Sequence, residues 1–230
     1  WSSDVCSSDL FRHLFVGSEG TLGLILEATM RLTRAPRAPV VLCLALPRLD
    51  AIMDVATAFQ AGLDLTAFEF FSEPALARVV ETGAARPFPA QSAFYALLEF
   101  EGDDGGSVDT ALGCYEHCRQ QGWVDDGVIS QSGAQAAALW RLRESISETL
   151  APLLPYKNDI SVIPSRVPDF LAEVDALCIE HYPDFELVWY GHIGDGNLHL
   201  NVLKPDLLAL EEFRRRCAEV SVHLDRRAHV

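Results

Sequence analysis

The sequence predicts an α+β fold in which helices lie mainly on one face of an antiparallel sheet. Two observations predict it. Short β-like runs alternate with amphipathic helical runs along the chain, after a break at Pro36 and Pro39. Several β-like runs, such as 65–71, are half-polar. Strands of a fully covered parallel sheet are more continuously apolar, so an antiparallel sheet is favoured.

Length and composition limit the classes of protein that the sequence fits. The chain has 230 residues, of which 49% are hydrophobic and 22% charged, enough for a sizeable core and too apolar for general disorder. A formal net charge of −15 disfavours general nucleic-acid binding. No run of about eighteen apolar residues is present, so no transmembrane segment is expected. Six scattered cysteines without a CxxC pair favour reduced thiols and a cytoplasmic protein.

The strands follow from runs of apolar or alternating residues bounded by turn signals. Residues 24–32 alternate, 40–46 and 93–101 are the most apolar, and 124–130 is a weaker run. The expected strands are 24–32, 40–46, 65–71, 93–101, 124–130, 159–163, 185–190 and 198–203.

The helices follow from apolar residues that recur every three to four positions. In residues 49–61, for example, Ile52, Val55 and Phe59 share one face. Ser165 is expected to cap the N-terminus of the fifth helix. The expected helices are 49–61, 73–81, 107–121, 135–150, 165–181 and 207–227.

Both ends of the chain indicate a fragment. Residues 1–10 lack periodicity and back-translate to a sequence resembling a sequencing-library adapter, so we treat them as an artefact. Natural sequence is then expected from about Phe11. The helix at 207–227 runs towards the last residue without a cap. We therefore expect a fold truncated at both ends.

The sharpest motif is YGHIGDGNLHLN at 190–201. Its Asp-Gly pair at 195–196 predicts a two-residue β-hairpin loop. Such a loop places His192 directly opposite His199, with Cβ atoms about 4.5–5.5 Å apart and Asn201 on the same face. Two imidazoles at this spacing suit one divalent cation, with an ordinary packed hairpin as the alternative.

A second motif combines cations with a hydroxyl. Arg143 and Ser147 are four residues apart on the helix expected at 135–150, so they share a face, and Lys157 follows near the next strand. A guanidinium beside a hydroxyl and a second cation suits a carboxylate ligand. The alternative is a solvated helix face.

A third motif, GSEGTLG, lies at 17–23. Closely spaced glycines let a backbone approach a ligand, and exposed amides can hold phosphate. Its spacing matches neither a P-loop nor a GxGxxG loop, so an ordinary turn is an equal alternative.

Together the motifs resemble the FAD-linked oxidases of the vanillyl-alcohol-oxidase type, in the D-2-hydroxyacid dehydrogenase group. GSEGTLG resembles the end of the FAD-binding domain. RESIS, YKNDISV and GHIGDGNLHLNV resemble the ferredoxin-like cap domain, an α+β domain with an antiparallel sheet. The resemblance implies that residues 11–36 end the FAD-binding domain and that 37–230 form an incomplete substrate or cap domain.

The resemblance also implies roles for individual residues. His192 and His199 would bind a divalent metal, zinc or manganese. A further metal ligand and the base are expected in a segment after the last helix, so no catalytic residue is assigned in this sequence. The implied substrate-binding residues are Arg143, Ser147, Lys157 and Asn201. The implied FAD-binding residues are Gly17, Ser18, Glu19, Gly20, Thr21 and Gly23.

The implied activity is FAD-dependent oxidation of a D-2-hydroxy acid to the 2-oxo acid, with the fragment itself inactive. Two cations favour the dicarboxylate D-2-hydroxyglutarate. A D-lactate dehydrogenase, the FAD subunit of a glycolate oxidase and a non-catalytic ferredoxin-like ligand-binding module are alternatives. The alkyl-glycerone-phosphate synthase type is disfavoured, because the adjacent histidines expected in its cap are absent. The implied electron acceptor is a separate electron-transfer protein, quinone or cytochrome. A homodimer and peripheral association with the inner membrane are left open.

Overall fold

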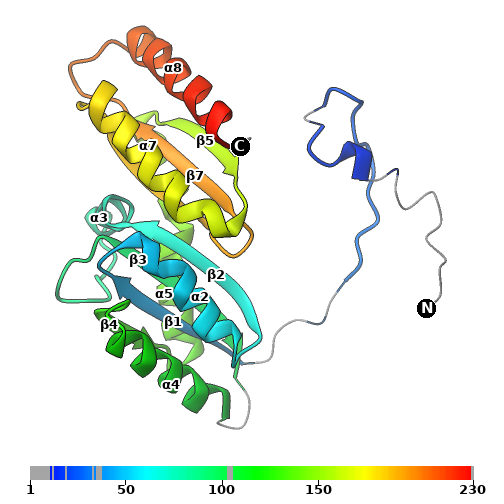
Figure 1. Ribbon diagram of the computed structural model, residues 1–230, viewed down its shortest axis with the longest axis vertical. Helices are drawn as coiled ribbons and strands as arrows, with labels where there is room; N and C mark the ends of the chain where they lie inside the picture. The colour runs from blue at the N-terminus through cyan, green and yellow to red at the C-terminus, as the bar shows by residue number, and fades with distance from the viewer. Residues whose placement is uncertain are drawn as a thin grey trace. The chain divides into compact units, whose positions relative to one another are not determined.

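A computed structural model describes residues 11, 13–18, 20–32, 34, 38–102 and 106–228, with side chains described up to Val222 (Figure 1). The chain divides into two units, residues 1–35 and 36–230. The segment interpreted as adapter-derived, residues 1–10, lies outside the described residues. No helix in the described ranges has both the length and the apolar character needed to cross a bilayer.

The second unit is built on a seven-stranded sheet in the order β4-β1-β3-β2-β6-β7-β5. Every pair of neighbouring strands is antiparallel, which confirms the predicted α+β class. The strands are β1 (Pro39–Leu46), β2 (Leu65–Ser72), β3 (Phe94–Glu101), β4 (Asp126–Ile129), β5 (Tyr156–Ser161), β6 (Glu186–His192) and β7 (Asn197–Leu203).

Helices connect these strands. They are α2 (Ile52–Gln60), α3 (Glu73–Glu81), α4 (Gly106–Gln120), α5 (Gly133–Glu144), α6 (Ile146–Leu150), α7 (Val167–His181) and α8 (Leu210–Ala228). Short 3-10 turns are η1 (Leu49–Ala51), η2 (Ala151–Leu153) and η3 (Pro164–Arg166).

The sheet contains a topological repeat. Strands β1 to β4, with α2 and α4, form a β-α-β-β-α-β unit whose strands lie in the order β4-β1-β3-β2. The elements β5, α7, β6, β7 and α8 repeat its first five members, with strand order β5-β7-β6. The halves join where β2 pairs with β6, with Phe70 opposite Gly191 and Phe71 opposite Tyr190. Side chains near this junction therefore come from both halves.

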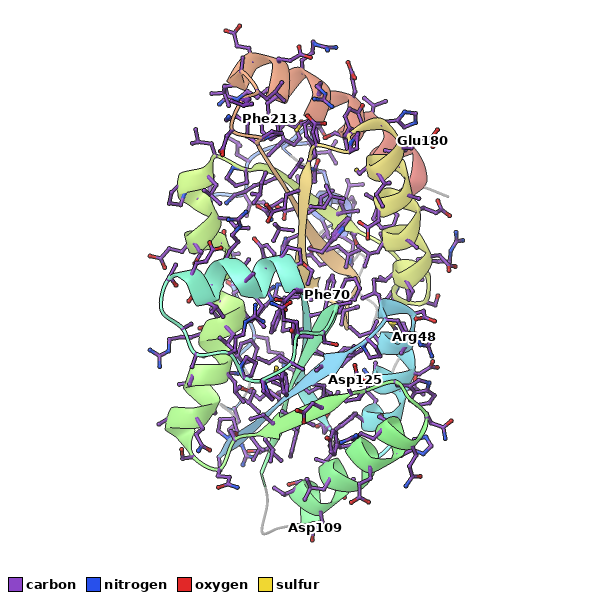
Figure 2. All side chains as sticks on the ribbon, turned by 90° about the vertical axis from the view of Figure 1, so that its left-hand side faces the viewer. Arg48, Phe70, Asp109, Asp125, Glu180 and Phe213 are labelled. Carbon is purple, nitrogen blue, oxygen red and sulfur yellow. The ribbon has the colours of Figure 1, made fainter. Side chains whose placement is uncertain are left out.

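The longest helices, α4, α7 and α8, lie with α2 on one face of the sheet, as predicted, and α3, α5 and α6 cover the other face. The larger core packs the sheet against α2, α4, α7 and α8, and includes Phe70 and Phe213 (Figure 2). The other core packs it against α3, α5 and α6. In Figure 1, α2 and α7 lie in front of the sheet and α5 behind it. The physical reason is visible in β1, where every residue of 41–46 is buried, so both faces need cover.

Two helix predictions are corrected. The helix expected at 135–150 breaks at Ser145, so α5 and α6 are separate. The helix expected to begin at Ser165 starts as the turn η3 at Pro164, and α7 follows with Arg166 at its N-cap and no side-chain cap. Proline suits the first position of such a turn, and Ser165 therefore lies inside it.

The strand expected at 24–32 does not form. The described residues of the first unit pair with no strand, and residues 24–32 have no regular secondary structure. Their apolar side chains are exposed, including Leu24, Leu26 and Met30. A strand needs a hydrogen-bonded neighbour, and the described part of this unit supplies none.

Candidate functional site

The β6–β7 hairpin sets the spacing of the two histidines. His192 lies opposite Asn197, and His199 lies opposite Tyr190, so the predicted direct pairing of the histidines is wrong. The loop spans four residues, 193–196, and this shifts the register by two positions. Because side chains alternate with a period of two, an even shift keeps both histidines on one face. Their ring centroids are 5.6 Å apart.

Glycine at two positions lets this hairpin pack closely. Gly196 has φ of +76°, and an added Cβ there would overlap with the backbone carbonyl of Val162. The Val162 amide donates to the Gly196 carbonyl at 2.9 Å, which ties the loop to the end of β5. A Cβ at Gly191 would likewise overlap with the carbonyl oxygen of Asn197. The backbone around the histidines is therefore tightly fixed.

Each histidine is held by a carboxylate. His192 Nδ1 lies 2.5 Å from Glu69 Oε1, and His199 Nδ1 lies 2.5 Å from Asp159 Oδ1. An ionised carboxylate only accepts, so Nδ1 of each neutral ring carries the proton and Nε2 keeps its lone pair. Metal-binding histidines are commonly held in this way, with the second ring nitrogen donating to a carboxylate.

The donor set fits part of a metal shell. Two free Nε2 atoms on one face suit zinc, which in proteins takes about four ligands. Among the described residues no group of three or more His, Cys, Asp and Glu side chains could hold a metal ion. The described residues therefore offer at most the two histidine nitrogens to a metal ion, and the fit to a metal shell is partial.

Arg143 occupies a different environment from the one predicted. It is buried near the end of α5, and its Nε and Nη2 atoms both lie 3.0 Å from Glu69 Oε2. Its guanidinium carbon lies 4.7 Å from the centre of the Tyr190 ring. Arg143 pairs with Glu69 from the last turn of α5, and Ser147 lies beyond the helix break at Ser145, in α6.

Sequence reasoning missed Glu69, which links the two motifs by contacting both Arg143 and His192. It is only 6% exposed although it is charged. The available signal was its position as the one charged residue in the run 65–72. A lone carboxylate in a buried strand needs partners.

Ser147 and Lys157 meet at the edge of the same face. The Lys157 ammonium donates to Ser147 Oγ at 3.3 Å, and both atoms are accessible. Lys157 lies in β5 directly opposite Asn201 on β7, since β5 begins at Tyr156, earlier than predicted. Asn201 is 1% exposed, and its Oδ1 has no hydrogen-bond partner in the described structure.

An unsatisfied buried acceptor such as Asn201 Oδ1 costs about 1–3 kcal/mol.

The structure brings together most of the predicted ligand-binding residues on the sheet face that α5 and α6 cover. They are Arg143, Ser147, Lys157, His192, His199 and Asn201.

The glycine motif of the first unit forms a tight turn. Gly17, Gly20 and Gly23 all have positive φ, so their conformation favours glycine. The Thr21 amide donates to the Ser18 carbonyl at 2.8 Å and closes the turn. The predicted FAD-binding residue Glu19 lies outside the described residues.

Comparisons with known proteins agree on one family. A family model described as "FAD linked oxidases, C-terminal domain" matches residues 35–221. D-2-hydroxyglutarate dehydrogenase of Stutzerimonas stutzeri (strain A1501) is 57% identical over 211 residues, 91% of this chain and 46% of the relative. The protein of the same name from Xanthomonas citri pv. viticola is 54% identical, over 92% of this chain and 45% of its own length. The chain thus spans about half the length of these curated relatives.

A solved structure shares the fold. An alkyldihydroxyacetonephosphate synthase aligns with a TM-score of 0.60, over 95% of this chain and 44% of its own. The two sequences are 12% identical, so this likeness concerns the fold alone.

Proposed function

Because the chain belongs to the FAD-linked oxidases, as their C-terminal domain, we propose that it forms the substrate-binding part of a flavoenzyme. The enzyme oxidises a D-2-hydroxy acid to the 2-oxo acid, with D-2-hydroxyglutarate as the favoured substrate. One observation carries the proposal: two histidines with free Nε2 atoms, a buried amide and two cations converge on one sheet face. The names of the two similar bacterial relatives agree with this substrate.

We propose that the cations orient the acid. Lys157 is exposed and presents a point charge next to the Ser147 hydroxyl. Arg143 uses Nε and Nη2 towards Glu69, which leaves N–H groups of the guanidinium for a ligand carboxylate. Two cations suit a substrate with two carboxylates, and fixing both ends of the acid orients its C2 atom.

His192 and His199 are the proposed metal-binding residues. Held through Nδ1, each would present Nε2 to a zinc or manganese ion, and such an ion, when bound, would lower the pKa of a hydroxyl group that it binds. The Asn201 Oδ1 is a buried acceptor suited to a donor group of the bound acid.

Residues 11–36 are proposed as the end of the FAD-binding domain, in which the turn at 17–23 lines the flavin. A bound flavin would supply the hydride acceptor, so a separate electron acceptor is part of the proposal: an electron-transfer protein, a quinone or a cytochrome. We also propose a cytoplasmic location. All five described cysteines are free, as is usual in a reducing compartment.

The test compares two substrates in the full-length enzyme that contains this chain. Lys157→Met should raise KM for D-2-hydroxyglutarate about tenfold or more. The reason is that it removes one charge-assisted hydrogen bond to the substrate, whose free energy corresponds to a factor of this size. D-lactate, with a single carboxylate, should be affected much less. Arg214→Met removes an exposed cation from α8, on the opposite face of the sheet, and is the matched control. Equal effects on both acids would remove the basis for the dicarboxylate, and failure to oxidise either acid would refute the activity.

A further inference from the structure

We propose that Glu69 is a positioning residue that holds His192 and Arg143 together and so couples metal binding to carboxylate binding. The inference rests on the proposed function, because the roles of the two partners come from it. The contacts of Glu69 stand independently of those roles, and the experiments below separate the two.

Glu69 divides its two oxygens between two partners. Oε1 lies 2.5 Å from His192 Nδ1, and Oε2 lies 3.0 Å from both Nε and Nη2 of Arg143. Its strand, β2, belongs to the first half of the sheet, whereas His192 ends β6 of the second half. A single buried carboxylate therefore joins two groups that the sequence places 49 residues apart.

The contact with His192 decides which ring nitrogen carries the proton. A carboxylate at Nδ1 selects the tautomer with the proton on Nδ1, so Nε2 is free to bind a metal. Loss of such a partner typically lowers metal affinity ten- to hundredfold. The matching contact of His199 differs, because its partner Asp159 has a side chain that is 79% exposed. The Glu69 side chain is 7% exposed and is therefore the more buried of the two supports.

The contact with Arg143 fixes a guanidinium plane. Two of its nitrogens lie 3.0 Å from one Glu69 oxygen, and its central carbon lies over the Tyr190 ring. A planar guanidinium held by two of its nitrogens presents its remaining N–H groups in a fixed direction. His192, the proposed metal ligand, and Arg143, the proposed partner of a substrate carboxylate, thus both depend on Glu69. A change that moves Glu69 therefore moves both side chains.

Glu69→Gln is the informative variant because it keeps shape and removes charge. A glutamine side chain has one acceptor oxygen and one amino group, which only donates, so it cannot accept from both Arg143 and the Nδ1–H of His192. If its oxygen accepts from Arg143, its amino group can meet His192 Nδ1 only when the ring proton lies on Nε2. Glu73→Gln is the matched control. Glu73 lies four residues away, is also partly buried, and pairs with Arg86 and Tyr95 and not with the site.

The first experiment measures ring tautomers by nitrogen-15 NMR in the 230-residue chain, at about pH 8.5, where histidine is ordinarily neutral. The His192 signal is identified by its loss in His192→Ala. The wild type and Glu73→Gln should show the proton on Nδ1 of His192 and a protected Arg143 Nε–H signal. Glu69→Gln should show mixed tautomers or lose the Arg143 signal. Unchanged signals in Glu69→Gln, or the same change in Glu73→Gln, would overturn the proposal.

The second experiment measures zinc affinity of the same variants by calorimetry. Glu69→Gln should bind zinc ten- to hundredfold more weakly than the wild type, and Glu73→Gln should match the wild type. Equal affinity of Glu69→Gln and the wild type would overturn the coupling. If the wild type binds no zinc, the metal part of the proposed function is refuted, and the tautomer comparison alone decides the role of Glu69.

Discussion

Replacing Gly196 with alanine should destabilise the second unit strongly, because the hairpin that carries both histidines depends on this glycine. A left-handed backbone costs an L-residue about 1–2 kcal/mol, and φ at Gly196 is +76°. The added Cβ would also overlap with the Val162 carbonyl, a backbone atom that cannot rotate away. Forcing atoms into a packed site costs about 1–3 kcal/mol.

Relief of that overlap also breaks the hydrogen bond from the Val162 amide to the Gly196 carbonyl, worth about 0.5–1.5 kcal/mol. Together these effects predict a loss of about 2.5–6.5 kcal/mol in the free energy of unfolding. Urea denaturation of the 230-residue chain, followed by circular dichroism, measures it.

Gly113→Ala is the matched control for this prediction. Gly113 lies within α4, and an added Cβ there meets no atom within 4 Å. Alanine should therefore stabilise the helix by about 0.5–1 kcal/mol. A Gly196→Ala protein within about 1 kcal/mol of the wild type would refute the reasoning, and so would equal losses in both variants.

Two further predictions concern buried groups. Arg143→Met should lower the free energy of unfolding by about 3–5 kcal/mol, because it leaves Glu69 buried without its cation. Arg215→Met removes an exposed cation and should cost less than about 1 kcal/mol in the same urea assay, so equal losses would contradict the role of burial. Burial raises the pKa of the Cys43 thiol from 9.0 to about 12, so the unfolded chain loses this proton first and stability should fall as pH rises from 9 to 12. The urea concentration at the unfolding midpoint measures this decline, and it should fall less with pH in Cys43→Ala. The same pH profile in both proteins would contradict the assignment of the decline to Cys43.

Local periodicity was sufficient to predict the sheet class and most elements. The seven strands of the second unit match predicted runs because alternation and apolar runs are local signals, as in 93–101, observed as β3. The alternation also placed His192, His199 and Asn201 on one face correctly, although the register was wrong. An even shift in register preserves the face, so this part of the site did not depend on the loop length.

Long-range contacts could not be predicted from local patterns. Glu69 meets His192 only because β2 pairs with β6, a contact that no spacing within either run encodes. The helix breaks at Ser145, just after Arg143, and the helical periodicity around it gave no sign of a break. Residues 24–32 have a strand pattern without a partner strand, and hydrogen bonding to a neighbour decides whether such a pattern becomes a strand.

The junction between the two topological halves has a mechanical consequence. Aligned residue pairs number two between β2 and β6, against eight between β1 and β3, so the junction has the shortest ladder in the described sheet. Opening along this line therefore breaks the fewest backbone hydrogen bonds, and such sites open first in native-state hydrogen exchange. Glu69 and His192 lie on opposite sides of that line. The proposed ligand site lies beside this short ladder, so a ligand held by both halves would oppose its opening.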